Sequence, residues 1–298
     1  MNETRIGLIG VGLMGHGIAT SILRHGHRLT LLDHAGNQPV DDLLAAGAAT
    51  IDTPAALARA VDLVILCVTG TPQVEDVLFG KQGLLDGLQP GGIVIDCSTA
   101  IPSSTLKIAA AVKQAGGLFL DAPMTRTPKE AAEGRLNLVV GGERALFDRC
   151  LPILQCYAEN IVYAGKTGSG HQLKLLHNFV SLGFSTVLAE AAACARLAGV
   201  DAAVFTDVLA NGGGDGVVLN RLRPYIETGD ASGFRFSISN ALKDMGYYTA
   251  MADDLGASCA AASAIEQVYA EASNAGLAQA AVPALIDHLA RTEGTAAQ

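Results

Sequence analysis

The chain has 298 residues, which is long enough for two domains with well-buried cores. Half of the residues are hydrophobic and only 16% are charged, a composition typical of a packed α/β or α protein and not of a disordered chain. The formal net charge of −9 argues against nucleic acid or an anionic membrane surface as a partner. Six cysteines without C-x-x-C spacing, and an amino terminus without an export segment, predict a cytoplasmic protein with reduced thiols.

Short β-like runs alternate with Ala-rich helical segments from Arg5 to about Tyr163. Several runs are continuous in Val, Ile and Leu, as expected for parallel strands that are covered on both faces. The alternation predicts an α/β fold of the Rossmann type, with a doubly wound parallel sheet. The expected strands read "RIGLIG", "RLTLLD", "DLVILCV", "GIVIDCS", "GLFLDAP", "LNLVVGG" and "NIVYAG".

The pattern changes after Gly165, because no further segment reads as a strand. A long apolar helix is expected from about Gly170 to Leu197, followed by several shorter helices. Lys174, His177, Asn178 and Glu190 interrupt the long helix, so we expect a buried helix and not a membrane span. The predicted domains are therefore a dinucleotide-binding domain over residues 1–164 and an all-helical domain over residues 165–298.

The first expected strand leads into "GLIGVGLMGHGIA", which has Gly10, Gly12 and Gly15 in G-x-G-x-x-G spacing. The three glycines allow a tight turn, close approach of a pyrophosphate, and close packing of helix on strand. Asp33 ends the second strand roughly 20 residues later, where a carboxylate accepts from ribose hydroxyls and repels a 2′-phosphate. NAD is therefore the expected cofactor, with NADP left open by His34 beside it. The expected contacts from these loops are Gly10, Gly12, Leu13, Met14, Gly15, Asp33 and Val68.

The stretch "GSGHQLKLLHN" places Lys174 and Asn178 one turn apart on one face of the long helix. A lysine on an apolar helix is costly to bury, which favours a chemical role for Lys174 over a side chain that merely reaches solvent. His171 and His177 are expected to be packing histidines. No cluster has the spacing of metal ligands, so no metal is expected.

In "DAPMTRTPKEA", Thr127, Pro128 and Glu130 form a capping box that starts a helix directly after a strand. Arg126 precedes the cap at the edge of the sheet where open α/β folds bind ligands. Its planar guanidinium suits an anion with two or three oxygens. We expect Arg126, with the hydroxyls of Thr125 and Thr127 beside it, to bind a small anionic substrate, the alternative being a solvated arginine beside a helix cap.

Together these motifs resemble the β-hydroxyacid dehydrogenases, the family of 3-hydroxyisobutyrate dehydrogenase and tartronate semialdehyde reductase. The resemblance covers nearly the whole chain and includes "DCSTAIPSST", "EGRLNLVVGG" and "LKDMGYY" in the family's order. It implies that Lys174 is the catalytic residue and that Asn178 lies at the substrate. It places Ser98 and Thr99 beside the nicotinamide, with Ser98 binding the substrate and Thr99 the cofactor. It implies that Lys243 contacts both cofactor and substrate, that Lys243 and Asp244 close the site, and that the protein is a homodimer or homotetramer.

The chain departs from this family where Thr125-Arg126-Thr127 replaces the usual Ser-Gly-Gly. A subset that resembles sulfolactaldehyde reductase has an Arg-Thr pair there. The expected function is NAD-dependent interconversion of a small anionic aldehyde and its primary alcohol, with sulfolactaldehyde and 2,3-dihydroxypropane-1-sulfonate as the leading pair. The alternatives are a 3-hydroxyisobutyrate or tartronate semialdehyde type of enzyme acting on a carboxylate, an imine reductase, and a dinucleotide sensor without turnover.

Overall fold

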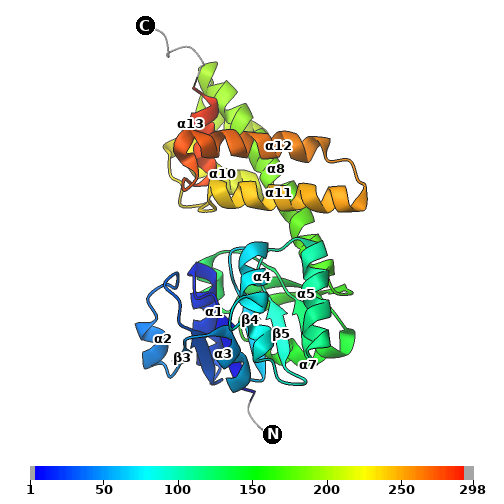
Figure 1. Ribbon diagram of the computed structural model, residues 1–298. Helices are drawn as coiled ribbons and strands as arrows, with labels where there is room; N and C mark the ends of the chain where they lie inside the picture. Colours follow the sequence, from blue (N-terminus) through cyan, green and yellow to red (C-terminus); the bar gives the residue numbers. More distant parts are fainter. Residues whose placement is uncertain (1–3, 292–298) are drawn as a thin grey trace. The chain divides into compact units, whose positions relative to one another are not determined.

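The structure is a computed structural model that describes residues 4–291. The chain divides into two compact units, residues 1–174 and 175–298, and helix α8 (Ser169–Leu197) begins in the first unit and continues in the second (Figure 1). The division falls inside one helix, and the predicted domain bounds at residues 164 and 165 stay a prediction.

The first unit is built on a twisted sheet with the strand order β3-β2-β1-β4-β5-β6-β8-β7, and β9 pairs with β8. Neighbouring strands from β3 to β6 are parallel, while β8 runs antiparallel to β6 and β7 and parallel to β9. The order 3-2-1-4-5-6 is that of a Rossmann fold, as predicted. The strands are β1 (Ile6–Ile9), β2 (Leu29–Leu32), β3 (Ala49–Ile51), β4 (Leu63–Leu66), β5 (Ile93–Asp96), β6 (Leu118–Asp121), β7 (Met124–Thr125), β8 (Leu136–Gly141) and β9 (Ala158–Gly165).

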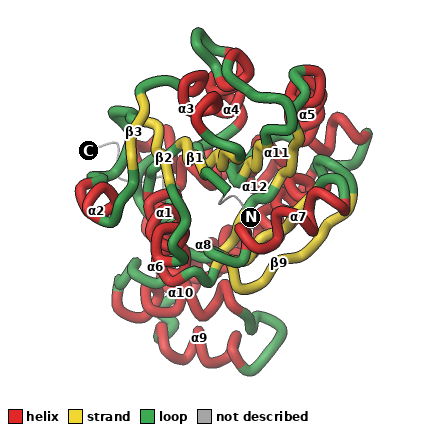
Figure 2. Tube along the Cα trace, turned by 90° about the horizontal axis from the view of Figure 1, so that it is seen from below, coloured by secondary structure: helices red, strands yellow, loops and turns green. Residues whose placement is uncertain are grey.

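Helices cover both faces of this sheet, which Figure 2 shows with α3, α4 and α5 on one side of the strands and α1 and α6 on the other. Ile18 of α1, Ala131 of α6 and Phe147 of α7 belong to one buried cluster. Leu57 of α3 and Ile108 of α5 belong to the cluster on the opposite face. The helices of this unit are α1 (Leu13–Arg24), α2 (Asp41–Ala45), α3 (Pro54–Ala60), α4 (Thr71–Phe79), η1 (Leu84–Asp86), α5 (Pro102–Gln114), α6 (Pro128–Glu133) and α7 (Arg144–Leu154).

All seven strands expected from the sequence form, and two short ones were missed. β3 has three residues, all exposed or half-buried, and β7 has only two, of which Met124 is buried and Thr125 half-buried. Strands this short and this little buried leave no run of apolar residues to detect.

The second unit contains no strand within its described residues and only one isolated bridge, between Ser237 and Ala281. Leu182 and Leu188 of α8 pack in its core with Met245 and Tyr269, and the Tyr269 hydroxyl donates to the Leu182 carbonyl at 3.1 Å. The all-helical prediction is therefore confirmed. The other helices are α9 (Ala202–Ala210), α10 (Val217–Thr228), α11 (Ile238–Leu255), α12 (Ala260–Ala272), η2 (Ser273–Leu277), η3 (Val282–Ala284) and α13 (Leu285–Leu289).

Among the described helices, α8 alone is long and apolar enough to cross a membrane by length and composition. Half of its most apolar window is buried inside the protein. Leu182, Leu188 and Ala192 belong to that buried half and lie in the second unit's core.

Candidate active site

The glycine-rich turn after β1 has the geometry that its spacing predicts. Gly10 has φ +94°, and a Cβ there would lie 2.3 Å from the Cys67 carbonyl oxygen. A Cβ on Gly15 would lie 2.0 Å from the carbonyl oxygen of Gly10, so packing alone requires both glycines. A Cβ on Gly12, by contrast, would meet no heavy atom within 4 Å. The backbone at Gly12 thus faces open space at the start of α1, where Leu13 is exposed and Met14 half-buried, and this cradle fits the pyrophosphate of a dinucleotide.

Asp33 follows β2 directly and is exposed, and its backbone N–H donates to the Ile51 carbonyl at 2.8 Å. The bond holds Asp33 at the carboxyl edge of the sheet, on the strand next to the glycine-rich turn. His34 is held within its own loop, because its Nδ1 accepts from the Gly36 N–H at 2.9 Å. Asp33 thus lies at the edge of the sheet where dinucleotides bind in such folds, and its contact with a ribose stays a prediction.

Strand register brings Val68 and Ser98 together beside that turn. Leu66 of β4 pairs with Asp96 of β5, so the residues that follow these two strands are neighbours. The Val68 N–H donates to the Ser98 hydroxyl at 3.1 Å, and the Ser98 N–H donates to the Asp96 carboxylate at 2.9 Å. Ser98 is 3% exposed and Thr99 half-buried, so these hydrogen bonds fix the shape of the segment.

The capping box predicted before α6 is present. Thr127 is the N-cap residue, Pro128 occupies the first turn, and the Glu130 carboxylate accepts from the Thr127 N–H at 3.0 Å. The Thr127 hydroxyl donates to the same carboxylate at 2.5 Å, so its proton is committed to the cap. The Thr125 hydroxyl instead accepts from the Asn137 amide at 3.1 Å and keeps its own proton available.

Arg126 has a left-handed backbone, φ +84°, and its side chain is 27% exposed. Its Nη1 lies 2.5 Å from the Glu159 carboxylate and also donates to the Arg135 carbonyl. The Arg126 guanidinium holds the pKa of Glu159 below its usual range. An incoming anion would therefore share Arg126 with a resident carboxylate or displace it. No local pattern in the sequence marks Glu159, because it comes to Arg126 only through the pairing of both β7 and β9 with β8.

Asn178 and Lys243 meet around a buried carboxylate in the second unit. The Asn178 amide on α8 donates to the Asp244 carboxylate on α11 at 2.6 Å, and the Lys243 ammonium lies 3.2 Å from the other oxygen of Asp244. His177 lies 2.9 Å from the Asn178 side-chain oxygen, which orients the amide. Asp244 is 2% exposed and serves as the common anchor of both side chains. Lys174 is half-buried one turn before Asn178 on α8.

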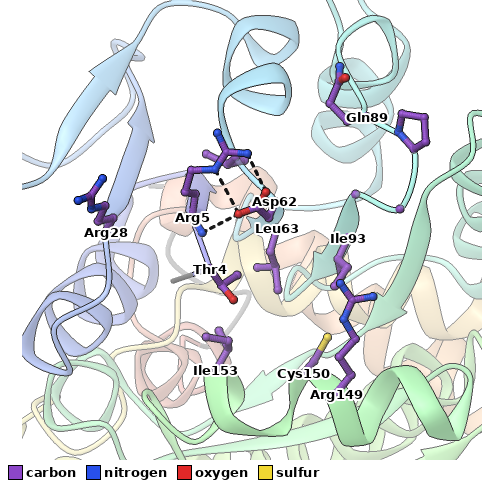
Figure 3. Close-up of a pocket in the computed structure, with 14 residues that line it drawn as sticks. Thr4, Arg5, Arg28, Asp62, Leu63, Gln89, Ile93, Arg149, Cys150 and Ile153 are labelled. Carbon is purple, nitrogen blue, oxygen red and sulfur yellow. Dashed lines mark hydrogen bonds and ion pairs between the residues drawn. The ribbon is translucent and has the colours of Figure 1, made fainter. Parts of the chain in front are cut away.

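A hollow of about 830 Å³ lies elsewhere in the first unit (Figure 3). It opens at the amino ends of β1, β4 and β5, where Arg5 pairs with Asp62 at 2.7 Å, and Arg149 and Cys150 of α7 line it too. Dinucleotides and substrates bind at the opposite, carboxyl edge of such sheets. Across residues 4–291, no group of three His, Cys, Asp or Glu side chains is placed to hold a metal ion.

The Rossmann sheet has an open glycine-rich turn, and helix α8 after it has Lys174 and Asn178 on one face. These features are typical of an NAD(P)-dependent oxidoreductase. Residues 5–165 match the NAD binding domain of 6-phosphogluconate dehydrogenase, and residues 168–289 match the NAD-binding region of NADP-dependent 3-hydroxyisobutyrate dehydrogenase. The chain belongs to the β-hydroxyacid dehydrogenase family. It is an NAD(P)-binding enzyme of the group that acts on hydroxyl substrates.

Three similar proteins illustrate the range of this family. The chain is 30% identical to 3-sulfolactaldehyde reductase of Escherichia coli over 294 residues, 98% of each protein. It is 34% identical to 2-hydroxy-3-oxopropionate reductase of the same organism over 198 residues, 66% of this chain and 67% of that protein. The crystal structure of 3-hydroxyisobutyrate dehydrogenase from Salmonella typhimurium matches this structure with a TM-score of 0.83 at 29% identity. The match covers 96% of this chain and 100% of that chain.

Proposed function

We propose that this enzyme uses NADH to interconvert a small anionic aldehyde and its primary alcohol, with sulfolactaldehyde and 2,3-dihydroxypropane-1-sulfonate as the leading pair. The observation that carries the proposal is the backbone of Arg126, φ +84°. A residue other than glycine is destabilised by about 1–2 kcal/mol in this left-handed conformation. The family that the sequence resembles usually has glycine at this position, so a strained arginine favours a role in function.

Arg126 and Thr125 together offer donors for the anionic group. A sulfonate has three acceptor oxygens, which suit the guanidinium fork and the free proton of the Thr125 hydroxyl. A carboxylate has two oxygens in one plane and would use the guanidinium alone. Thr127 contributes through the cap that fixes the turn, because its hydroxyl donates to Glu130.

The cofactor preference rests on Asp33. An exposed carboxylate at the end of β2 accepts hydrogen bonds from ribose hydroxyls and repels a 2′-phosphate, which favours NADH over NADPH. Gly12 leaves room for the pyrophosphate, and Ser98 and Thr99 lie on the rigid segment assigned to the nicotinamide. Bound nicotinamide supplies or accepts the hydride.

Lys174 acts in the proposed reaction as the proton donor to the substrate oxygen during reduction and as the acceptor during oxidation. Asn178 uses one amide N–H on Asp244, and the second remains for the substrate hydroxyl. Lys243 holds a positive charge beside the same carboxylate and contributes to binding of the anionic substrate and cofactor.

The relatives support two substrate classes. The relative that matches along 98% of this chain is named for a sulfonated aldehyde, and the one that matches along 66% is named for an oxo acid. The second candidate is therefore a 3-hydroxyacid dehydrogenase of the 3-hydroxyisobutyrate or tartronate semialdehyde type, with Arg126 on the substrate carboxylate.

We also propose a cytoplasmic homodimer or homotetramer. Val180 and Val187 of α8 are 69% and 60% exposed, and Val208 of α9 is 67% exposed. Apolar side chains repeated along exposed helix faces are typical of surfaces buried between subunits. Light scattering after gel filtration measures the assembly directly.

The decisive experiment is a substrate series with both cofactors. Aldehydes of equal chain length that carry a sulfonate, a carboxylate, a phosphonate or no charge are compared by kcat/KM with NADH and NADPH. The proposal expects the sulfonate to lead and the uncharged aldehyde to be poorest. A leading carboxylate would replace sulfolactaldehyde by the 3-hydroxyacid alternative, and NADH binding without turnover of any aldehyde would indicate a dinucleotide sensor.

A further inference from the structure

His171 lies in the first turn of α8 and is fully buried. Its Nε2 is 3.1 Å from the carbonyl oxygen of Ser98, and its Nδ1 is 2.8 Å from the hydroxyl of Thr105 on α5. Its backbone N–H donates to the Asp121 carboxylate at 3.0 Å. One residue thus joins the segment after β5, the helix α5 and the end of β6 to the start of α8.

Both ring nitrogens of His171 have a partner on another element. The Ser98 carbonyl is an acceptor only, so Nε2 donates to it. The Thr105 hydroxyl lies within hydrogen-bond distance of Nδ1 and of the Ile101 carbonyl, which also accepts from the Thr105 N–H at 3.0 Å. The ring is therefore held at both of its nitrogens.

A buried carboxyl group lies next to this ring. The Asp96 Oδ2 atom is buried without a hydrogen-bond partner and lies 3.9 Å from His171 Nε2. Burial raises the pKa of Asp96. The other titratable neighbours are Asp121, held by the N–H groups of Gly168 and His171, and Cys67, whose pKa burial raises to about 12 and which is therefore neutral.

We propose that His171 is a positioning residue that fixes the Ser98–Thr99 segment relative to Lys174. Lys174 follows His171 by three residues, nearly one turn of the same helix, so a bond at His171 sets the position of the lysine. This inference rests on the proposed placement of the nicotinamide at Ser98 and Thr99 and on the proposed role of Lys174.

The test compares His171→Leu, His171→Gln and Thr105→Val with Ile108→Val, a conservative core change on α5 that touches none of these groups. Three quantities are measured: the melting temperature, kcat, and Kd for NADH and for ADP-ribose, which lacks the nicotinamide. His171→Leu should weaken NADH binding and lower kcat about tenfold or more, the scale of a lost buried hydrogen bond, with ADP-ribose binding unchanged. His171→Gln keeps a donor for Ser98 and should recover most of the loss, and Thr105→Val should lie between them.

A purely structural histidine predicts a different result. In that case kcat and the ratio of the Kd for NADH to the Kd for ADP-ribose change only in proportion to the loss of melting temperature, as in Ile108→Val. That result would show the proposal to be wrong. If Lys174→Ala retains normal activity, the proposed role of Lys174 fails, while the Kd values for NADH and ADP-ribose still test the role of His171.

Discussion

Replacing Arg126 by glycine and by alanine separates its backbone strain from its charge. Both changes remove the guanidinium and its pair with Glu159, a half-exposed ion pair that contributes at most about 1 kcal/mol. They differ at φ +84°, where alanine is strained by about 1–2 kcal/mol and glycine is not. The greater entropy of glycine in the unfolded chain offsets about 0.4–1 kcal/mol of this difference.

The glycine variant should therefore be more stable than the alanine variant by about 1 kcal/mol, or about 2–4 °C in melting temperature for a unit of this size. Calorimetry measures that difference. Both variants should lose about 100-fold in kcat/KM for a charged aldehyde and little for an uncharged one of similar size, because a charge-assisted bond is lost on one side. Glu159→Gln, which removes the resident carboxylate, should leave the charged substrate bound at least as well as before.

Arg135→Ala is the matched control, since it removes a neighbouring arginine that pairs with Glu133 and has an ordinary backbone. It should change neither the melting temperature nor the discrimination between charged and uncharged aldehydes. Equal losses for both aldehydes in the Arg126 variants would refute the anion site. Arg126 would then serve only to tie β7 to β9 through Glu159.

Four further changes test the rest of the proposed site. Asp33→Ala should bring kcat/KM for NADPH towards that for NADH, and an unmodified enzyme without a preference would contradict the ribose assignment. Lys174→Ala should bind NADH normally and lose ~10²–10⁴ in kcat, the usual scale for a positioned acid–base group, whereas near-normal turnover returns Lys174 to a packing role. Asp244→Ala should raise KM for the aldehyde about tenfold because Asn178 loses its partner, and Asp244→Asn should raise it less because an acceptor remains. Gly12→Ala should leave the melting temperature unchanged, because its Cβ meets open space, and should weaken NADH binding measured by fluorescence titration.

The sequence alone determined the fold class, because each element carries its own signal. Continuous apolar runs separated by amphipathic helices specify a parallel sheet, and G-x-G-x-x-G after the first strand specifies its dinucleotide turn. The same local character explains why the capping box at Thr127 and Glu130 was predicted correctly: its hydrogen bonds join residues three positions apart. The Lys174 and Asn178 face of α8 was likewise readable from helical spacing.

Only the tertiary structure decided the partners of these residues. Glu159 reaches Arg126, and Asp244 reaches Asn178, across 33 and 66 positions of sequence. His171 reads in the sequence as a packing histidine, and its partners Ser98 and Thr105 are 73 and 66 positions away. Such contacts depend on strand register and helix packing, which are set by the fit of all elements together. The pattern of a single segment determines what that segment forms, and the packed core determines which charge lies beside which.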